Sequence, residues 1–134
     1  MPTITEIEGI GEAFAKKLRA AGIFTTESLL SKGATPKGRK ELAEATGFSE
    51  QVILDWVNRA DLFRVPGIGA QYSDLLEAAG VDTVRELAKR KPEALAETLA
   101  KVNAEKNKVN KLPGLSVIQK WVETAKTLPK GIQY

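Results

Sequence analysis

The chain has 134 residues, of which 43% are hydrophobic and 28% are charged, a composition typical of a folded globular protein rather than a disordered one. It contains no cysteine and no histidine, which excludes disulfides, thiolate metal sites and catalysis or metal binding by imidazole. Its 20 basic and 17 acidic residues give a net charge of +3, which is compatible with a polyanionic partner without requiring one.

No apolar run reaches membrane-spanning length, and residues 1–6 lack the basic and apolar regions of a signal peptide. We therefore expect a cytoplasmic protein without a membrane partner. The acidic residues are scattered along the chain, and no lysine–aspartate pair marks a base-sized pocket. We expect no enzymatic activity, no cofactor, no metal site and no catalytic residues.

The chain contains an internal repeat. Ile7–Gly11 matches Val65–Gly69, and the register stays constant (67 − 9 = 58) through the glycines that follow. Val52–Val57 then matches Val117–Val122 at a larger offset (117 − 52 = 65), so the second copy holds seven extra residues, expected within residues 103–114. We predict two units, residues 1–60 and 61–128, followed by a tail at residues 129–134.

Each unit is predicted to open with one helical turn and then a longer helix. Thr3 and Asp61 occupy equivalent positions, and both are good N-cap residues for the opening turn. The longer helix should run from a glycine turn to Gly22 or Gly80, where glycine supplies the left-handed conformation that ends a helix. Positive φ angles are therefore expected at both of these glycines.

The later helices of the first copy also carry start and stop signals. Thr25 begins one helix, Thr35-Pro36 opens another that Gly47 closes, and Ser49 caps the last. Equivalent apolar faces hold Trp56 and Trp121, which are predicted to be buried, as are Phe14 and Tyr72. No segment shows sustained strand alternation. The sequence predicts an all-α fold of two tandem units, each with four to five short helices.

Both copies contain a Gly-Ile-Gly turn followed four residues later by a small residue, Ala15 or Ser73. The isoleucine is expected to fill the core, while the small residue lets the flanking helices approach closely. Valine at either glycine of the second turn is expected to strain the backbone. Such a turn directs backbone N–H groups outward at the start of a helix, where they attract phosphate oxygens.

The segments Ile7–Leu18 and Val65–Leu76 resemble the helix-hairpin-helix family of DNA repair, recombination and replication proteins. The resemblance implies a grip on the DNA backbone that does not read sequence, often by two motifs that straddle the minor groove. Carried over by position, it implies that the nucleic-acid-binding residues are Gly9, Ile10, Gly11 and Glu12 in the first copy and Gly67, Ile68, Gly69 and Ala70 in the second, with side-chain contacts from Lys16 and Lys17.

Over the whole chain, the segments Asp61–Gly69 and Leu75–Thr83 resemble the uncharacterised prokaryotic domain-of-unknown-function family 4332. Membership in that family implies the fold and leaves the function open.

Several charges oppose phosphate binding. Glu8 and Glu12 flank the first turn, and Asp74 occupies the position in the second copy that Lys16 holds in the first. The basic run Lys101–Lys111, in which Glu105 is the only acid, favours phosphate binding. Two hypotheses therefore stay open. One is a module that binds the DNA or RNA backbone without sequence specificity, and the other is a protein-interaction or scaffold domain that keeps the hairpin fold without a phosphate site.

Overall fold

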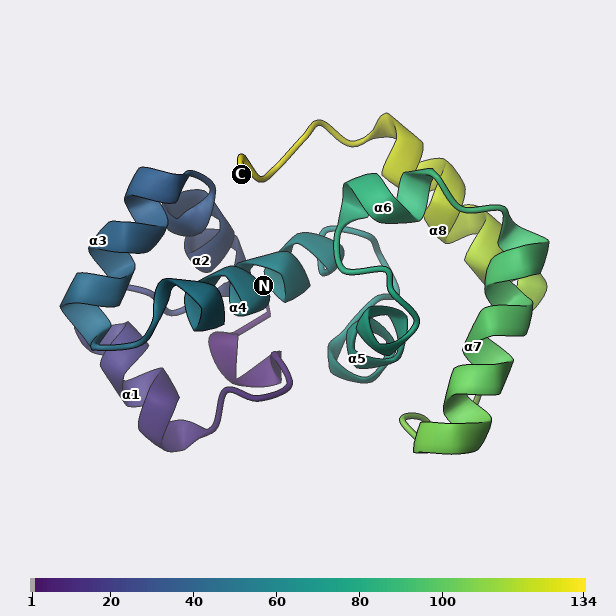
Figure 1. Cartoon of the computed structure of the whole chain (residues 1–134), viewed down its shortest axis with the longest axis horizontal. Coiled ribbons are helices and arrows are strands. Elements are labelled where there is room, and N and C mark those ends of the chain that lie inside the picture. Colours follow the sequence, from purple (N-terminus) through teal and green to yellow (C-terminus); the bar gives the residue numbers. More distant parts are fainter. Residues whose placement is uncertain (1) are drawn as a thin grey trace. The chain divides into compact units, whose positions relative to one another are not determined.

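A computed structural model describes residues 2–134, which form an all-α protein (Figure 1). In chain order the elements are the 3-10 turn η1 (Ile4–Glu6) and the helices α1 (Glu12–Ala20), α2 (Thr26–Gly33), α3 (Pro36–Thr46), α4 (Glu50–Leu62), α5 (Ala70–Ala78), α6 (Val84–Ala88), α7 (Pro92–Lys106) and α8 (Leu115–Thr127). Within residues 2–134 the extended backbone pairs only in an isolated bridge between Thr3 and Thr25. The all-α prediction is confirmed. None of the described helices is long and apolar enough to cross a membrane.

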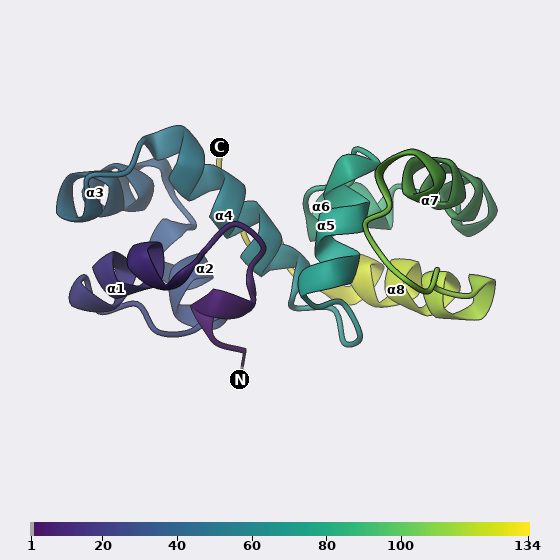
Figure 2. The same cartoon turned by 90° about the horizontal axis from the view of Figure 1, so that it is seen from below.

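The chain divides into two compact units, each with four α-helices. The first unit contains residues 2–61 and the C-terminal Lys130–Tyr134, and the second contains Leu62–Pro129. Figure 2 shows α1 to α4 of the first unit and α5 to α8 of the second. The division falls in the last turn of α4, so that helix ends on the first residue of the second unit.

Four of the eight described α-helices begin with the expected side-chain cap, and three are followed by a left-handed glycine. Thr25, Thr35, Ser49 and Thr83 each accept a hydrogen bond from the backbone N–H three residues ahead. A cap of this kind contributes about 1 kcal/mol to helix stability. Gly22 and Gly80 follow helix ends with φ angles of 86° and 89°, as predicted, and Gly47, which was predicted to end a helix, has φ 81°.

Asp61 does not cap a helix. It lies inside α4 and is 2% exposed, and no 3-10 turn precedes the second glycine turn. The apolar face of α4 continues to Leu62, which is fully buried, so packing extends the helix past a residue whose side chain favours a helix start. The prediction of equivalent opening turns was therefore wrong for the second unit.

The last helix of each unit carries the tryptophan that closes its core. Trp56 on α4 is 6% exposed and Trp121 on α8 is 2% exposed, as predicted. Ala15 and Ser73, the small residues of the first helix in each unit, are fully buried and allow close helix packing.

The second unit differs from the first in the length of its third helix and the loop after it. The N-caps Thr35 and Lys91 are 56 residues apart (91 − 35), whereas Val52 and Val117 are 65 apart (117 − 52). Helix α7 has 15 residues against 11 in α3, and an eight-residue loop (107–114) joins it to α8. The extra length therefore lies both in the helix and in the loop.

The C-terminal segment packs against α2 and α3 of the first unit. Ile132 is 3% exposed, and the Gln133 N–H donates to the Ala34 carbonyl at 2.7 Å. Arg39, which is 5% exposed, donates from its guanidinium to the carbonyls of Gly33 at 2.8 Å and Gln133 at 2.7 Å. This segment is an integral part of the first unit, not a frayed end.

The two glycines of each Gly-Ile-Gly turn have different backbone conformations. Gly9 and Gly67 have φ angles of 97° and 92°, in the left-handed region that L-residues avoid. Gly11 and Gly69, with φ of −85° and −120°, are extended and occupy the N-cap positions of α1 and α5. A Cβ at either of these two positions would meet no atom within 4 Å. The expected strain at Gly69 is therefore wrong, because an N-cap residue is extended and any residue adopts that conformation.

Docking of the C-terminal segment predicts that Ile132→Ala destabilises the first unit. Loss of the buried side chain should lower its free energy of unfolding by about 2 kcal/mol. Native-state hydrogen exchange of the α2 and α3 amides measures this change. The control is Gln133→Ala, which keeps both backbone hydrogen bonds of that residue and should leave exchange unchanged. Equal protection in all three proteins would contradict the docking.

The turn geometry predicts opposite tolerance at neighbouring glycines. Gly67→Val should lower the free energy of unfolding by about 1–3 kcal/mol, because valine is strained at positive φ. Gly69→Ser should cause no loss, because serine adopts the extended conformation and caps a helix well. Urea denaturation followed by circular dichroism compares the two variants. An equal loss of unfolding free energy in both variants would contradict the difference in backbone conformation between Gly67 and Gly69.

Candidate nucleic-acid interface

The first Gly-Ile-Gly turn is closed by its isoleucine. The Ile10 N–H donates to the Ile7 carbonyl at 3.1 Å, and the Ile10 side chain is 3% exposed. The Gly11 carbonyl then accepts the Ala15 N–H at 2.9 Å, which is the first hydrogen bond of α1. Ile10 therefore anchors the turn and has already used its own N–H group.

Three other N–H groups of this turn remain open. Among the described residues, the backbone N–H groups of Gly9, Gly11 and Glu12 have no protein acceptor. Gly11 has no side chain with which to cap α1, and all three residues are exposed. These donors lie at the positive end of a nine-residue helix, where the helix dipole also favours an anion.

The second turn repeats this hydrogen-bond pattern. The Ile68 N–H donates to the Val65 carbonyl at 3.1 Å, and Ile68 is 4% exposed. The Gly69 carbonyl accepts the Ser73 N–H at 2.9 Å. Within the described part of the chain, no acceptor pairs with the N–H groups of Gly67, Gly69 and Ala70. Each turn thus presents three backbone donors at the start of a helix.

The charges near the first turn are partly compensated. Glu12 forms an ion pair with Arg19, whose guanidinium nitrogen lies 3.3 Å from its carboxylate. Lys16 and Lys17 are exposed one turn further along α1, and the Lys17 ammonium lies 5.5 Å from the centroid of the Phe48 ring. Lys17 is therefore held over an aromatic face, while Glu8 is a second exposed acid, directly before Gly9.

At the second turn, a lysine from the long loop compensates the opposing acid. The Lys108 ammonium lies 3.3 Å from the Asp74 carboxylate, and the two side chains are 33% and 15% exposed. The half-buried setting strengthens this pair relative to a fully exposed one. Asp74 was expected to oppose phosphate binding and the basic run that contains Lys108 to favour it, whereas in the structure the two residues pair.

The loop that supplies Lys108 is fixed by further contacts. The Asn103 side chain donates to the Val109 carbonyl at 3.1 Å and accepts the Val109 N–H at 2.9 Å, and Val109 is buried. The Tyr72 hydroxyl donates to the Lys111 carbonyl at 3.1 Å. The loop therefore packs along α5, the helix that the second turn begins.

Aromatic side chains support both tryptophans. Phe14, Phe48 and Trp56 form one cluster with ring centroids 5.1–5.8 Å apart. In the second unit Tyr72 lies 5.3 Å from Trp121. Tyr72 is half-buried, but Phe14 is 44% exposed, so the prediction that Phe14 is a core residue was wrong. It lies on the outer side of its cluster.

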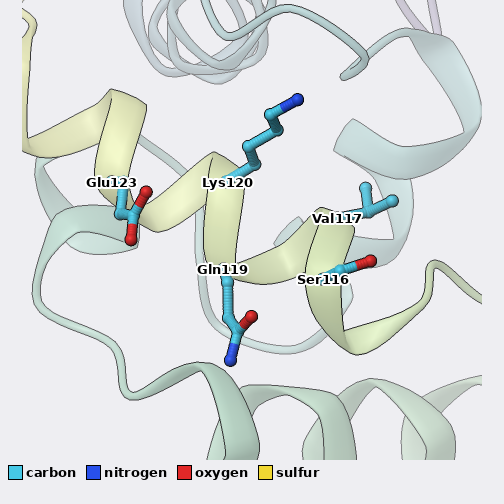
Figure 3. A pocket seen from close by; sticks show the side chains of 5 residues that line it. All are labelled: Ser116, Val117, Gln119, Lys120 and Glu123. Atoms are coloured by element: carbon cyan, nitrogen blue, oxygen red, sulfur yellow. The ribbon is translucent and has the colours of Figure 1, made fainter.

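A shallow hollow of about 280 Å³ lies along α8 (Figure 3). The described residues that line it are Ser116, Val117, Gln119, Lys120 and Glu123, all from this one helix. Figure 3 shows Gln119 and Lys120 pointing in different directions, so their polar atoms do not converge on a ligand. Within residues 2–134, no cluster of three side chains of metal-binding type occurs.

No curated protein and no solved structure matches the chain. Residues 8–128 match the model of a family described as domain of unknown function, DUF4332. This match begins at the first glycine turn and ends just beyond α8, so it covers both units. The chain therefore belongs to the DUF4332 family.

Proposed function

We propose that this protein binds the phosphate backbone of duplex DNA without reading its sequence, through its two Gly-Ile-Gly turns. The observation that carries the proposal is the set of three open backbone N–H groups at each turn, at the start of a nine-residue helix. Such donors and the helix dipole together attract phosphate oxygens. The resemblance of both segments to the helix-hairpin-helix family supports duplex DNA as the ligand.

Lack of sequence specificity follows from the donors themselves. Backbone N–H groups that contact phosphates fix the position of a protein on DNA but carry no information about the bases. Gly67, Gly69 and Ala70 offer no side chain that could reach a base edge. The proposed contacts are therefore expected to tolerate any sequence.

The charge distribution gives modest support for an anionic partner. Residues 65–134 carry eleven basic and eight acidic side chains, which accounts for the whole net charge of +3. The pairs Glu12–Arg19 and Asp74–Lys108 reduce the repulsion that the two acids would otherwise exert on a phosphate. With few free cations near each turn, we expect weak binding and a modest slope of log K against the logarithm of the salt concentration.

A protein-interaction domain is the second candidate function. The observation in its favour is a group of exposed apolar side chains at the start of α8, where Leu112, Leu115 and Val117 are 39%, 43% and 42% exposed. Exposed apolar patches mark sites of protein, membrane or ligand contact. This function predicts that variants of the glycine turns leave partner binding unchanged.

An aspartate at the N-cap tests the proposed function without disturbing the fold. Gly11→Asp and Gly69→Asp fit in open space, cap the N–H groups of their helices and repel phosphate. Each should therefore weaken binding to a short DNA duplex, measured by fluorescence anisotropy at two salt concentrations. The wild-type affinity should fall with salt, with a slope in log K of about −0.9 for each phosphate contacted.

Gly114→Asp is the matched control for these two variants. Gly114 also occupies the N-cap position of a helix, α8, and a Cβ there would also have open space, but it lies outside both turns. It introduces the same charge and should change the affinity least. Equal effects of all three substitutions would assign the loss to net charge alone, and absence of binding in low salt would leave the protein-interaction function.

The Asp74–Lys108 pair gives a second test of the proposal. Lys108→Ala removes the positive charge that lies 3.3 Å from the Asp74 carboxylate beside the second turn, and it should weaken DNA binding by about two- to fivefold. Asp74→Asn should tighten binding, because it removes the acid altogether. Lys106→Ala is the control, since it removes the same charge from an exposed position and leaves the Asp74–Lys108 ion pair intact. If Lys106→Ala and Lys108→Ala weaken binding equally, the pair has no specific effect on the turn.

A further inference from the structure

The indole N–H groups of both tryptophans lack a hydrogen-bond partner. Trp56 and Trp121 are 94% and 98% buried, yet within residues 2–134 neither indole nitrogen has an acceptor. The described residues contain no fully covered side-chain nitrogen or oxygen without a partner. Each indole nitrogen must therefore reach solvent through a small opening. A buried tryptophan normally pairs its N–H, so this repeated omission requires an explanation.

The openings lie at the glycine turns. A Cβ on Gly9 would stand 3.7 Å from the Trp56 indole nitrogen, and one on Gly67 would stand 3.3 Å from that of Trp121. The first glycine of each turn thus leaves uncovered the space beside the indole nitrogen. The indole nitrogen therefore lies beside the same segment that presents the open backbone N–H groups.

This arrangement is the same in both units although the sequence spacing differs. Gly9 and Trp56 are 47 residues apart (56 − 9), whereas Gly67 and Trp121 are 54 apart (121 − 67). The longer α7 and its loop absorb the difference, and the indole still lies beside the first glycine of the turn. The placement is therefore a feature of the folded units that does not depend on local spacing.

The surrounding aromatic rings hold each indole in this orientation. Phe14 and Phe48 pack against Trp56 with centroid separations of 5.8 and 5.1 Å, and Tyr72 packs against Trp121 at 5.3 Å. Because each indole is more than nine-tenths buried among close-packed neighbours, it cannot rotate freely to another acceptor. The N–H is thus fixed in direction before any ligand arrives.

We propose that Trp56 and Trp121 each donate an indole N–H to the phosphate bound at the neighbouring glycine turn. Each site would then combine three backbone donors with one rigid, neutral side-chain donor. This inference rests on the proposed function and adds a specific ligand contact to it. It also explains why these core positions hold tryptophan, since phenylalanine would fill the core but could not donate.

Nitrogen-15 NMR of the indole groups tests the proposal directly. The chain contains two tryptophans, so the spectrum should contain two indole cross-peaks, which Trp56→Phe and Trp121→Phe assign individually. In the free protein both indole protons should exchange rapidly with water. Titration with a short mixed-sequence DNA duplex in low salt should move both protons downfield and slow their exchange.

Affinity measurements complete the test. Replacing either tryptophan by benzothienylalanine, in which sulfur takes the place of the N–H, keeps the shape of the ring and should weaken duplex binding by about three- to tenfold. Circular dichroism and thermal unfolding verify that these proteins are folded. Trp56→Phe and Trp121→Phe should weaken binding similarly where they fold.

The outcomes separate this inference from the proposed function. If the duplex binds and the Gly11 and Gly69 amides respond while both indole peaks and the benzothienylalanine affinities stay unchanged, the indole contact is overturned and the turn function stands. Slow exchange of the indole protons in the free protein would also overturn the contact, because it would reveal a protein acceptor. If no duplex binds in low salt, the proposed function itself fails.

Discussion

Both units depend on a glycine that reverses the chain with a positive φ angle. At Gly9 and Gly67 the left-handed backbone lets two apolar side chains separated by only two residues enter the same core, Ile7 with Ile10 and Val65 with Ile68. The reversal also forms the hydrogen bond from the second apolar residue to the first, which fixes the start of the next helix. An L-residue at this position would strain the backbone and displace the anchor.

The same geometry explains why open donors occur at these turns. The isoleucine N–H is used to close the turn, whereas the N–H groups of the glycines on either side have no acceptor within residues 2–134. Stability and the proposed binding therefore depend on different atoms of one short segment. The first glycine and the isoleucine determine the shape, and the extended second glycine leaves the helix N-terminus without a cap. Because the second glycine does not determine the shape of the turn, it can be substituted without disturbing the fold.

The parts of the fold that sequence predicts are those set by local chemistry. Threonine and serine caps and left-handed glycines act within a few residues, so Thr25, Thr35 and Gly80 could be placed from the sequence. Asp61 shows the limit, because burial of the neighbouring Leu62 decides whether a helix continues there. Capping preference contributes about 1 kcal/mol, less than the burial of a leucine side chain.

The parts of the candidate site that sequence could not predict are contacts between distant segments. Lys108 and Asp74 are 34 residues apart (108 − 74), and their pairing depends on the path of a loop that Asn103 and Tyr72 fix. The indole of each tryptophan meets its glycine across about 50 residues of chain, as the spacing of Gly9 and Trp56 shows. No local pattern carries this information, because helix packing alone brings these groups together.

Positive charge lies near both turns, but different elements supply it. In the first unit the helix itself supplies the positive charges, since Lys16, Lys17 and Arg19 all lie on α1. Helix α5 carries no lysine or arginine, and the nearest compensation comes from the loop after α7. A lysine that is paired with an acid at 3.3 Å cancels repulsion but adds little attraction, whereas exposed lysines add attraction that salt screens. If both turns bind phosphate, the first should therefore lose more affinity than the second as the salt concentration rises.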